Sequence, residues 1–337
     1  MIKKPIMALP KLGLSRSAFC LLRFVMTATM HANSRPELEF VACPDPQGAH
    51  RMAFWRWGDA QAAHVVVCAH GLTRQGRDFD RLAQALVAQS PHPVQVICPD
   101  VVGRGRSDWL AEPAGYQIPQ YAADMLAMLA QVQQQMGSDN AMQPLDWVGT
   151  SMGGLIGIVL AGQPGLPLPA PIRRLVLNDV GPAIAWGSVQ RMQTYVGQYG
   201  QYRDLDEAAA AMWALSTGFG AVPADVWREM SAHMLRPGSA GAVTLHYDPA
   251  IGVPVRALTP EAAAAGEAAL WALYDQIQAK TLLIRGQESD LLTPETATAM
   301  TQRGPRAQLD TWPGFGHAPT LTGEDQIEVV AKFLLGD

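Results

Sequence analysis

The chain has 337 residues, of which 48% are hydrophobic and 16% charged, and its formal net charge is −5. This length and apolar content predict one large core that carries an insertion. No run of Lys or Arg stands out after residue 40, so neither nucleic acid nor another polyanion is an expected partner.

The first 37 residues are interpreted as a disordered leader. Two early lysines precede an apolar stretch at 18–30, which resembles a secretory signal, but Arg16 and Arg23 interrupt that pattern. At about 13 residues the stretch is also too short to cross a bilayer. A cytoplasmic protein without a membrane span is therefore expected, with export through the leader as the alternative.

The four cysteines are scattered along the chain and form no metal-like pair. Cys68 and Cys98 lie in apolar runs, where a small buried side chain is the ordinary interpretation. This usage fits a reducing compartment. No metal site and no cofactor are expected.

From residue 38 onward, short apolar runs alternate with helical patterns. The expected strands are 38–42, 52–57, 64–69, 94–98, 145–148, 174–177, 281–284 and 307–311. The expected helices between them are 80–89, 121–135 and 155–161. Uniformly apolar strands separated by helices predict an α/β fold with a mostly parallel, doubly wound sheet. In such a sheet the chemistry lies at the carboxyl ends of the strands.

The alternation breaks between residues 182 and 276, where the spacing is helical, no strand is expected and aromatic residues are frequent. We interpret this segment as a helical cap, or lid, inserted after the sixth strand. Residues 38–181 and 277–337 would then form the core. A few of the cap aromatics are expected to line a substrate pocket.

Ser151 is the candidate nucleophile, within the sequence Gly149-Thr150-Ser151-Met152-Gly153. The Gly-x-Ser-x-Gly pattern alone is weak, but here a buried strand leads into it and a helix leads out. A strand that turns sharply into a helix strains the residue at the apex and needs glycine beside it. The turn would raise the hydroxyl clear of the sheet, near the positive end of the helix.

Acyl transfer at such a serine needs two backbone N–H donors for the developing oxyanion. One is expected from Met152, directly after the nucleophile, and the other from Leu72, in the loop after the third strand. His70 in the same loop is expected to fix the backbone and not to act as the base.

His317 is the candidate general base, because it follows the last strand in a glycine-flanked loop. The acid that orients it should lie between nucleophile and base in the chain. Asp290, after the strand at 281–284, is the first choice, and Glu288 and Asp179 are the alternatives.

Taken together, these motifs resemble the α/β-hydrolase superfamily. The similarity includes the turn Asp100-Val101-Val102-Gly103-Arg104-Gly105-Arg106-Ser107 and covers about residues 38 to 337. The subgroup suggested carries a helical cap and includes carboxylesterases, lactonases and carbon–carbon bond hydrolases. In that family the turn shapes a loop, and Ser at position 151 excludes the relatives that use Asp as nucleophile.

The expected activity is hydrolysis of esters of small to medium apolar acids through an acyl-enzyme. A lactone substrate or a carbon–carbon hydrolase acting on a dienoate are the alternatives, and an acyltransferase or a non-catalytic ligand receptor rank below them. A small-molecule ester or lactone is thus the expected partner, and the sequence leaves the oligomeric state open.

Overall fold

The computed structural model describes residues 35–137, 140–198 and 200–336. The interpretation of the leader therefore falls almost entirely outside the described residues. No helix in the described ranges is both long and apolar enough to cross a bilayer.

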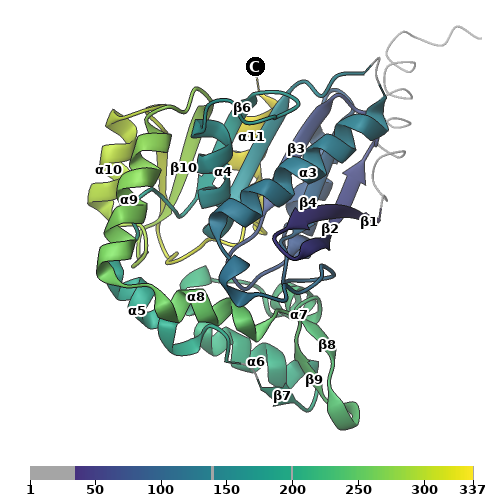
Figure 1. Cartoon of the computed structure of the whole chain (residues 1–337), viewed down its shortest axis with the longest axis vertical. Helices are drawn as coiled ribbons and strands as arrows, with labels where there is room; N and C mark the ends of the chain where they lie inside the picture. Colours follow the sequence, from purple (N-terminus) through teal and green to yellow (C-terminus); the bar gives the residue numbers. More distant parts are fainter. Residues whose placement is uncertain (1–34, 138–139, 199, 337) are drawn as a thin grey trace, which may run out of the picture.

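An eight-stranded sheet runs through the centre of the core in the order β1-β2-β4-β3-β5-β6-β10-β11 (Figure 1). The strands are β1 (Glu37–Asp45), β2 (Gly48–Gly58), β3 (His64–Ala69), β4 (Val94–Asp100), β5 (Leu145–Thr150), β6 (Ile172–Asn178), β10 (Lys280–Gly286) and β11 (Gln308–Trp312). The hairpin β1–β2 is antiparallel and joins β4 antiparallel, whereas the strands from β4 to β11 pair in parallel. The predicted fold class is confirmed.

Helices cover both faces of this sheet, which explains the uniformly apolar strands. Alternate residues of β3 pack in opposite directions, with Val65 and Val67 in one buried cluster and Val66 and Cys68 in the other. The first cluster includes residues of α3 (Ile118–Met136), α4 (Met152–Gly162) and α10 (Pro294–Gln302), and the second includes residues of α2 (Asp80–Gln89) and α11 (Glu324–Leu335). Because helices cover both faces of the sheet, only the ends of the strands can present side chains for catalysis.

Between β6 and β10 the chain leaves the sheet and forms a separate layer at its carboxyl edge (Figure 1). Its helices are α5 (Trp186–Tyr195), α6 (Leu205–Leu215), α7 (Ala224–Ala232) and α8 (Gly252–Ala257). The next helix, α9 (Pro260–Tyr274), leads the chain back to the core, where it packs against α4 and lies beside α10 (Figure 1). Short 3₁₀ turns complete the described elements: η1 (Gly76–Phe79), η2 (Pro113–Gly115), η3 (Thr217–Phe219), η4 (Ser239–Gly241) and η5 (Pro249–Ile251).

The expectation of a cap without strands is wrong. A small antiparallel sheet lies within it, in the order β7-β9-β8, formed by β7 (Gln201–Tyr202), β8 (Leu235–Pro237) and β9 (Val243–Leu245). Strands of two or three residues are too short to give a period-two pattern, so their pairing depends on contacts distant in the sequence.

The segment after β9 fastens the cap to the core loop that follows β4. The Gly105 N–H donates to His246 Nδ1 at 2.6 Å, and the Asp248 N–H donates to the Gly103 carbonyl at 2.8 Å. The Tyr116 hydroxyl donates to Asp248 Oδ2 at 2.6 Å, with both side chains buried. These contacts place the cap over the strand ends where the site lies.

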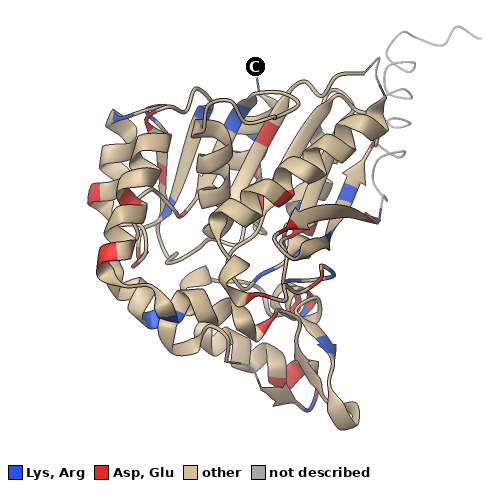
Figure 2. Cartoon of the chain, in the orientation of Figure 1, with Lys and Arg blue, Asp and Glu red and all other residues tan. Residues whose placement is uncertain are grey.

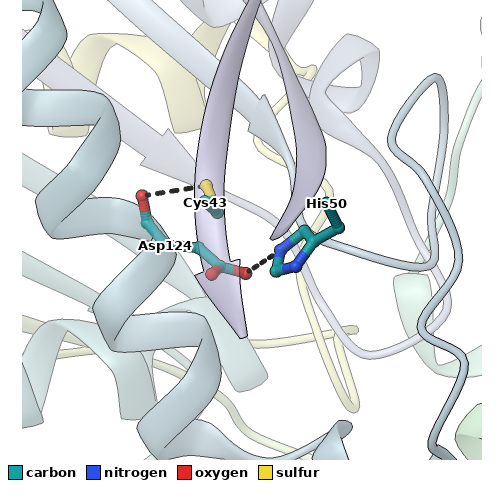
Figure 3. Close-up of side chains that lie close together, drawn as sticks. All are labelled: Cys43, His50 and Asp124. Atoms are coloured by element: carbon teal, nitrogen blue, oxygen red, sulfur yellow. Dashed lines mark hydrogen bonds and ion pairs between the residues drawn. The ribbon is translucent and has the colours of Figure 1, made fainter. Parts of the chain in front are cut away.

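A buried cluster of Cys43, His50 and Asp124 ties the β1–β2 hairpin to α3 (Figure 3). His50 places Nδ1 2.9 Å from Asp45 Oδ2 and Nε2 3.1 Å from Asp124 Oδ2, and the Cys43 thiol donates to the Asp124 carbonyl. Burial opposes a charge on the ring, but hydrogen bonds to Asp124 and Asp45 outweigh it and raise the pKa of His50. Burial raises the pKa of the Cys43 thiol. Because burial disfavours the thiolate that a metal ion would need from Cys43, we interpret the cluster as a structural clasp.

The clasp predicts a pH-dependent contribution to stability. The raised pKa of His50 means that its contribution is complete below the unfolded value of about 6.5 and is lost as the pH rises through the folded pKa. We expect His50→Gln to lower the free energy of unfolding by about 1–3 kcal/mol at about pH 6, and by less at about pH 9.

Urea unfolding of both proteins at the two pH values measures the difference. The control is His92→Gln, at an exposed histidine, which should cost little at either pH. An equal cost of His50→Gln at both pH values would contradict the charged clasp.

Candidate active site

Ser151 stands at the apex of the turn from β5 into α4, with φ 51° and ψ −116°. A positive φ is strained for a residue with a side chain and is typical of a serine raised above the sheet. The glycines beside it are required sterically. A Cβ on Gly149 would clash with the backbone of Gly153, and one on Gly153 would clash with the carbonyl of Ala69 in β3.

His317 lies in the loop after β11 and points its ring at Ser151. Its Nε2 is 2.9 Å from Ser151 Oγ, and its Nδ1 is 2.7 Å from Asp179 Oδ2. Asp179 follows β6 directly and is fully buried, whereas His317 and Ser151 are half-buried. A hydroxyl, an imidazole and a carboxylate thus form one continuous relay, the arrangement that activates a serine nucleophile.

Asp290 is the acid predicted to orient His317, but the carboxylate that contacts His317 in the structure is that of Asp179. The Asp290 side chain is 47% exposed and pairs with Arg191 on α5, whose Nη2 donates to Oδ1 at 3.1 Å. Asp290 instead accepts a hydrogen bond at its backbone carbonyl, from Ser188 at 2.6 Å. The physical reason is direction: the loop after β10 turns its serine inward and its aspartate outward. Glu288 does not contact His317 either, and its carboxylate accepts a hydrogen bond from the Gly314 N–H.

The carboxylate of Asp179 is held from three sides. Its Oδ1 accepts from the Gly286 N–H at 2.9 Å, and its Oδ2 accepts from the Ser289 hydroxyl at 2.6 Å as well as facing His317. Ser289 was not singled out from the sequence as a site residue. The sequence signal that favours Asp179 as the acid is its position directly after the strand β6, which pairs with β5 in the sheet.

Leu72 and Met152 both flank the nucleophile, and their backbone N–H groups donate to no other group in the described part of the chain. Ser151 lies close to this loop, since a Cβ on Gly71 would be 3.7 Å from Ser151 Cβ. Unpaired N–H donors beside a nucleophile are what an oxyanion requires. The arrangement is compatible with the predicted oxyanion hole.

His70 fixes two loops with its ring. Its Nδ1 donates to the Gly71 carbonyl at 2.7 Å, and its Nε2 accepts from the Val101 N–H at 3.0 Å. Burial, assisted by the charges of Arg104 and Arg74, lowers the pKa of His70 to about 3, so the ring is neutral. It takes no part in the relay.

The turn after β4 is organised around Asp100. Its carboxylate accepts from the N–H groups of Gly76 at 2.7 Å and Arg106 at 2.9 Å, and from Trp55 Nε1 at 3.2 Å. Burial raises the pKa of Asp100 to about 6. Ser107 donates to the Asp100 carbonyl and accepts from the Ala53 N–H, so this turn shapes the loop.

A cavity of about 30 Å³ opens beside the nucleophile, between the core loops and the cap. Its walls include Gly71, Thr150 and Arg74 from the core and Phe219 and Met230 from the cap. A space of this size holds one or two water-sized groups. A larger ester would require side chains of the cap to move.

An ion pair between Arg74 and Asp78 lines this cavity and packs against aromatic rings of the cap. Arg74 donates to Asp78 from Nε at 2.5 Å and from Nη2 at 2.7 Å, and its guanidinium lies 5.7 Å from the ring centres of Phe219 and Trp227. The pair leaves the cavity wall without net charge. Over the residues that the structure describes, Figure 2 shows Lys and Arg scattered among Asp and Glu, not gathered on one element.

The fold and the relay together define a known class of protein. A family model described as the alpha/beta hydrolase family matches residues 66–333. The chain belongs to the α/β hydrolase family.

Individual relatives agree with this assignment. A curated 3-hydroxybutyrate-oligomer hydrolase of Cupriavidus necator is 45% identical over 307 residues, covering 90% of this chain and 99% of the relative. The solved structure of an α/β hydrolase from Novosphingobium aromaticivorans is 31% identical, with a TM-score of 0.74 over 90% of this chain and 99% of the other. An esterase of Mycobacterium tuberculosis shares the fold at 22% identity, with a TM-score of 0.60 over 95% of this chain and 98% of the other. The chain is thus a hydrolase of this family.

Proposed function

We propose that the protein is a serine ester hydrolase that cleaves short linear oligomers of 3-hydroxybutyrate through an acyl-enzyme. The observation that carries the serine mechanism is the relay from Asp179 through His317 to Ser151, at 2.7 and 2.9 Å. The observation that favours the substrate is the 45% identity to a 3-hydroxybutyrate-oligomer hydrolase along almost the whole of both chains. The proposed substrate keeps the ester bond expected from the sequence but replaces the expected apolar acid with a short hydroxy acid.

The mechanism begins with attack of Ser151 Oγ on the carbonyl carbon of the ester, while His317 Nε2 takes the hydroxyl proton. The carbonyl oxygen becomes an oxyanion, which the N–H groups of Leu72 and Met152 would stabilise. The tetrahedral intermediate then collapses and expels the alcohol, which takes the proton from His317. Asp179 stabilises the imidazolium and keeps its tautomer, without taking the proton.

Deacylation repeats these steps with water. His317 takes a proton from a water molecule, whose oxygen attacks the acyl carbon, and Ser151 leaves with the proton returned by His317. For a dimer of 3-hydroxybutyrate, the alcohol released first and the acid released second are both 3-hydroxybutyrate. The same relay could act on a lactone or, by attack on a ketone, on a carbon–carbon bond, so the substrate assay must include those classes.

The test compares the linear dimer and trimer of 3-hydroxybutyrate with p-nitrophenyl butyrate, a lactone and a dienoate. We expect repeated release of 3-hydroxybutyrate from the oligomers, with a higher kcat/KM than for the lactone or the dienoate. Chromatographic quantification of the acid products measures it. Hydrolysis of p-nitrophenyl butyrate without hydrolysis of the oligomers would overturn the proposed substrate, while the proposed serine mechanism would stand. Folded protein that is inactive on every ester would overturn both.

A further inference from the structure

Arg104 is a buried cation in the turn after β4, and all four of its resolved hydrogen bonds are made inside the protein. Its side chain is fully buried. Its Nε donates to the Leu72 carbonyl at 2.8 Å, its Nη1 donates to the Val102 carbonyl at 2.7 Å and the Tyr121 hydroxyl at 3.0 Å, and its Nη2 lies 3.6 Å from Met152 Sδ. Val102 belongs to the same turn as Arg104, and the other three partners lie on the loop after β3, on α3 and on α4, so together they fix the plane of the guanidinium.

No carboxylate in the described residues pairs with this guanidinium. Its other neighbours are aromatic faces, with the ring centres of Tyr121 at 4.9 Å and Tyr116 at 5.7 Å. Carbonyl dipoles and ring faces stabilise the charge without neutralising it. A buried charge without a counter-ion is costly to maintain, and its field is weakly screened in so dry a place.

Two of the four partners, Leu72 and Met152, are the residues whose N–H groups are the predicted oxyanion donors. The bond to the Leu72 carbonyl fixes the peptide that follows Leu72, and the contact with Met152 Sδ fixes the side chain at the first position of α4. Leu72 comes from the loop after β3 and Met152 from the turn after β5, so without a link between them their relative position would depend on two separate loops. Arg104 supplies that link.

We propose that Arg104 is a positioning residue of the oxyanion hole, which holds Leu72 and Met152 together and adds a buried positive charge that favours the anionic tetrahedral intermediate. The inference rests on the proposed serine mechanism. A residue of this kind acts more strongly on the transition state than on the bound ester, because the negative charge forms only in the former. Its removal should therefore lower kcat more than it raises KM.

The experiment uses Arg104→Met, which removes the charge and the donors, and Arg104→Lys, which keeps a charge but not the planar set of donors. The control is Arg51→Gln, at a 59% exposed arginine on β2. The readouts are kcat and KM on p-nitrophenyl butyrate per active site, counted by titration, and the inhibition constant of butylboronic acid, which forms an anionic tetrahedral adduct with a serine.

For Arg104→Met we expect kcat to fall about 100-fold and boronate affinity to fall by a similar factor, with KM within about threefold. Arg104→Lys should lie between this variant and the wild type, and Arg51→Gln should match the wild type. A purely structural role would lower the active fraction and leave kcat per active site unchanged, which would overturn the inference.

Two further outcomes are decisive. If Arg104→Met does not fold, Arg104→Lys decides, because wild-type kcat and boronate affinity in that variant would overturn the positioning role. If the wild type itself neither hydrolyses the ester nor binds the boronate, the proposed function has failed and this inference with it.

Discussion

Ser151→Ala is expected to reduce kcat for ester hydrolysis by a factor on the order of 10⁴ or more. The reason is that Ser151 Oγ is the atom that faces His317 Nε2, at 2.9 Å, and alanine leaves no oxygen to attack the ester. The measurement is hydrolysis of p-nitrophenyl butyrate and of the 3-hydroxybutyrate dimer. The variant should keep its fold, because within the described residues the Ser151 side chain makes no hydrogen bond other than that to His317.

The control for this variant is Ser239→Ala, at an exposed serine of the cap that should retain wild-type rates. Thermal unfolding of both variants establishes that they are folded. Full activity in folded Ser151→Ala would contradict the assignment of the nucleophile.

Asp179→Asn is expected to lower kcat by about 10³- to 10⁴-fold, whereas Asp290→Asn should change it by less than about threefold. An amide in place of the Asp179 carboxylate cannot stabilise the imidazolium, and its NH₂ group would favour the wrong tautomer of His317. Asp290 lies 47% exposed against Arg191, so its removal loses only a surface ion pair. The matched measurement is kcat on p-nitrophenyl butyrate for the two variants, which carry the same chemical change.

The reverse result, with Asp290→Asn impaired and Asp179→Asn active, would restore the acid expected from the sequence. An equal loss in both variants would indicate that the two loops act together. Unfolding in urea must accompany the assay, because Asp179 also accepts from the Gly286 N–H and the Ser289 hydroxyl. A folded Asp179→Asn with wild-type kcat would contradict the relay.

The sheet was predictable from the sequence because its signal is local. Each of the eight expected strands coincides with a strand of the core, and the runs at the centre are uniformly apolar because helices cover both faces. The strands of the cap were missed for the opposite reason. Pairs such as Gln201 with Thr244 join residues far apart in the chain and leave no local pattern.

The site divides in the same way. Ser151 is marked by the glycines that its own turn requires, and His317 by its place after the last strand. The choice between Asp179 and Asp290 could not be made from chain order, because both follow the nucleophile and precede His317. It depends on which side chain a loop turns inward, and that is decided by partners such as Arg191 on α5.

In the sequence, Arg104 stands out only as a residue of the turn Asp100–Ser107. Its partners lie on the loop after β3, on α3 and on α4, and nothing in the local sequence predicts that they converge. The same holds for the clasp at His50, whose carboxylates come from β1 and α3. Long-range polar contacts of this kind follow from the packing of the elements, not from their patterns.

The most direct test of the serine mechanism is covalent labelling by a p-nitrophenyl alkylphosphonate, from which the serine oxygen displaces p-nitrophenolate at phosphorus. The modified residue is located by mass spectrometry of the peptides. Such a reagent reacts with a serine that an adjacent base activates. The account predicts one adduct per chain, on Ser151, with labelling lost in His317→Ala. A label on another residue, or no label on active enzyme, would contradict it.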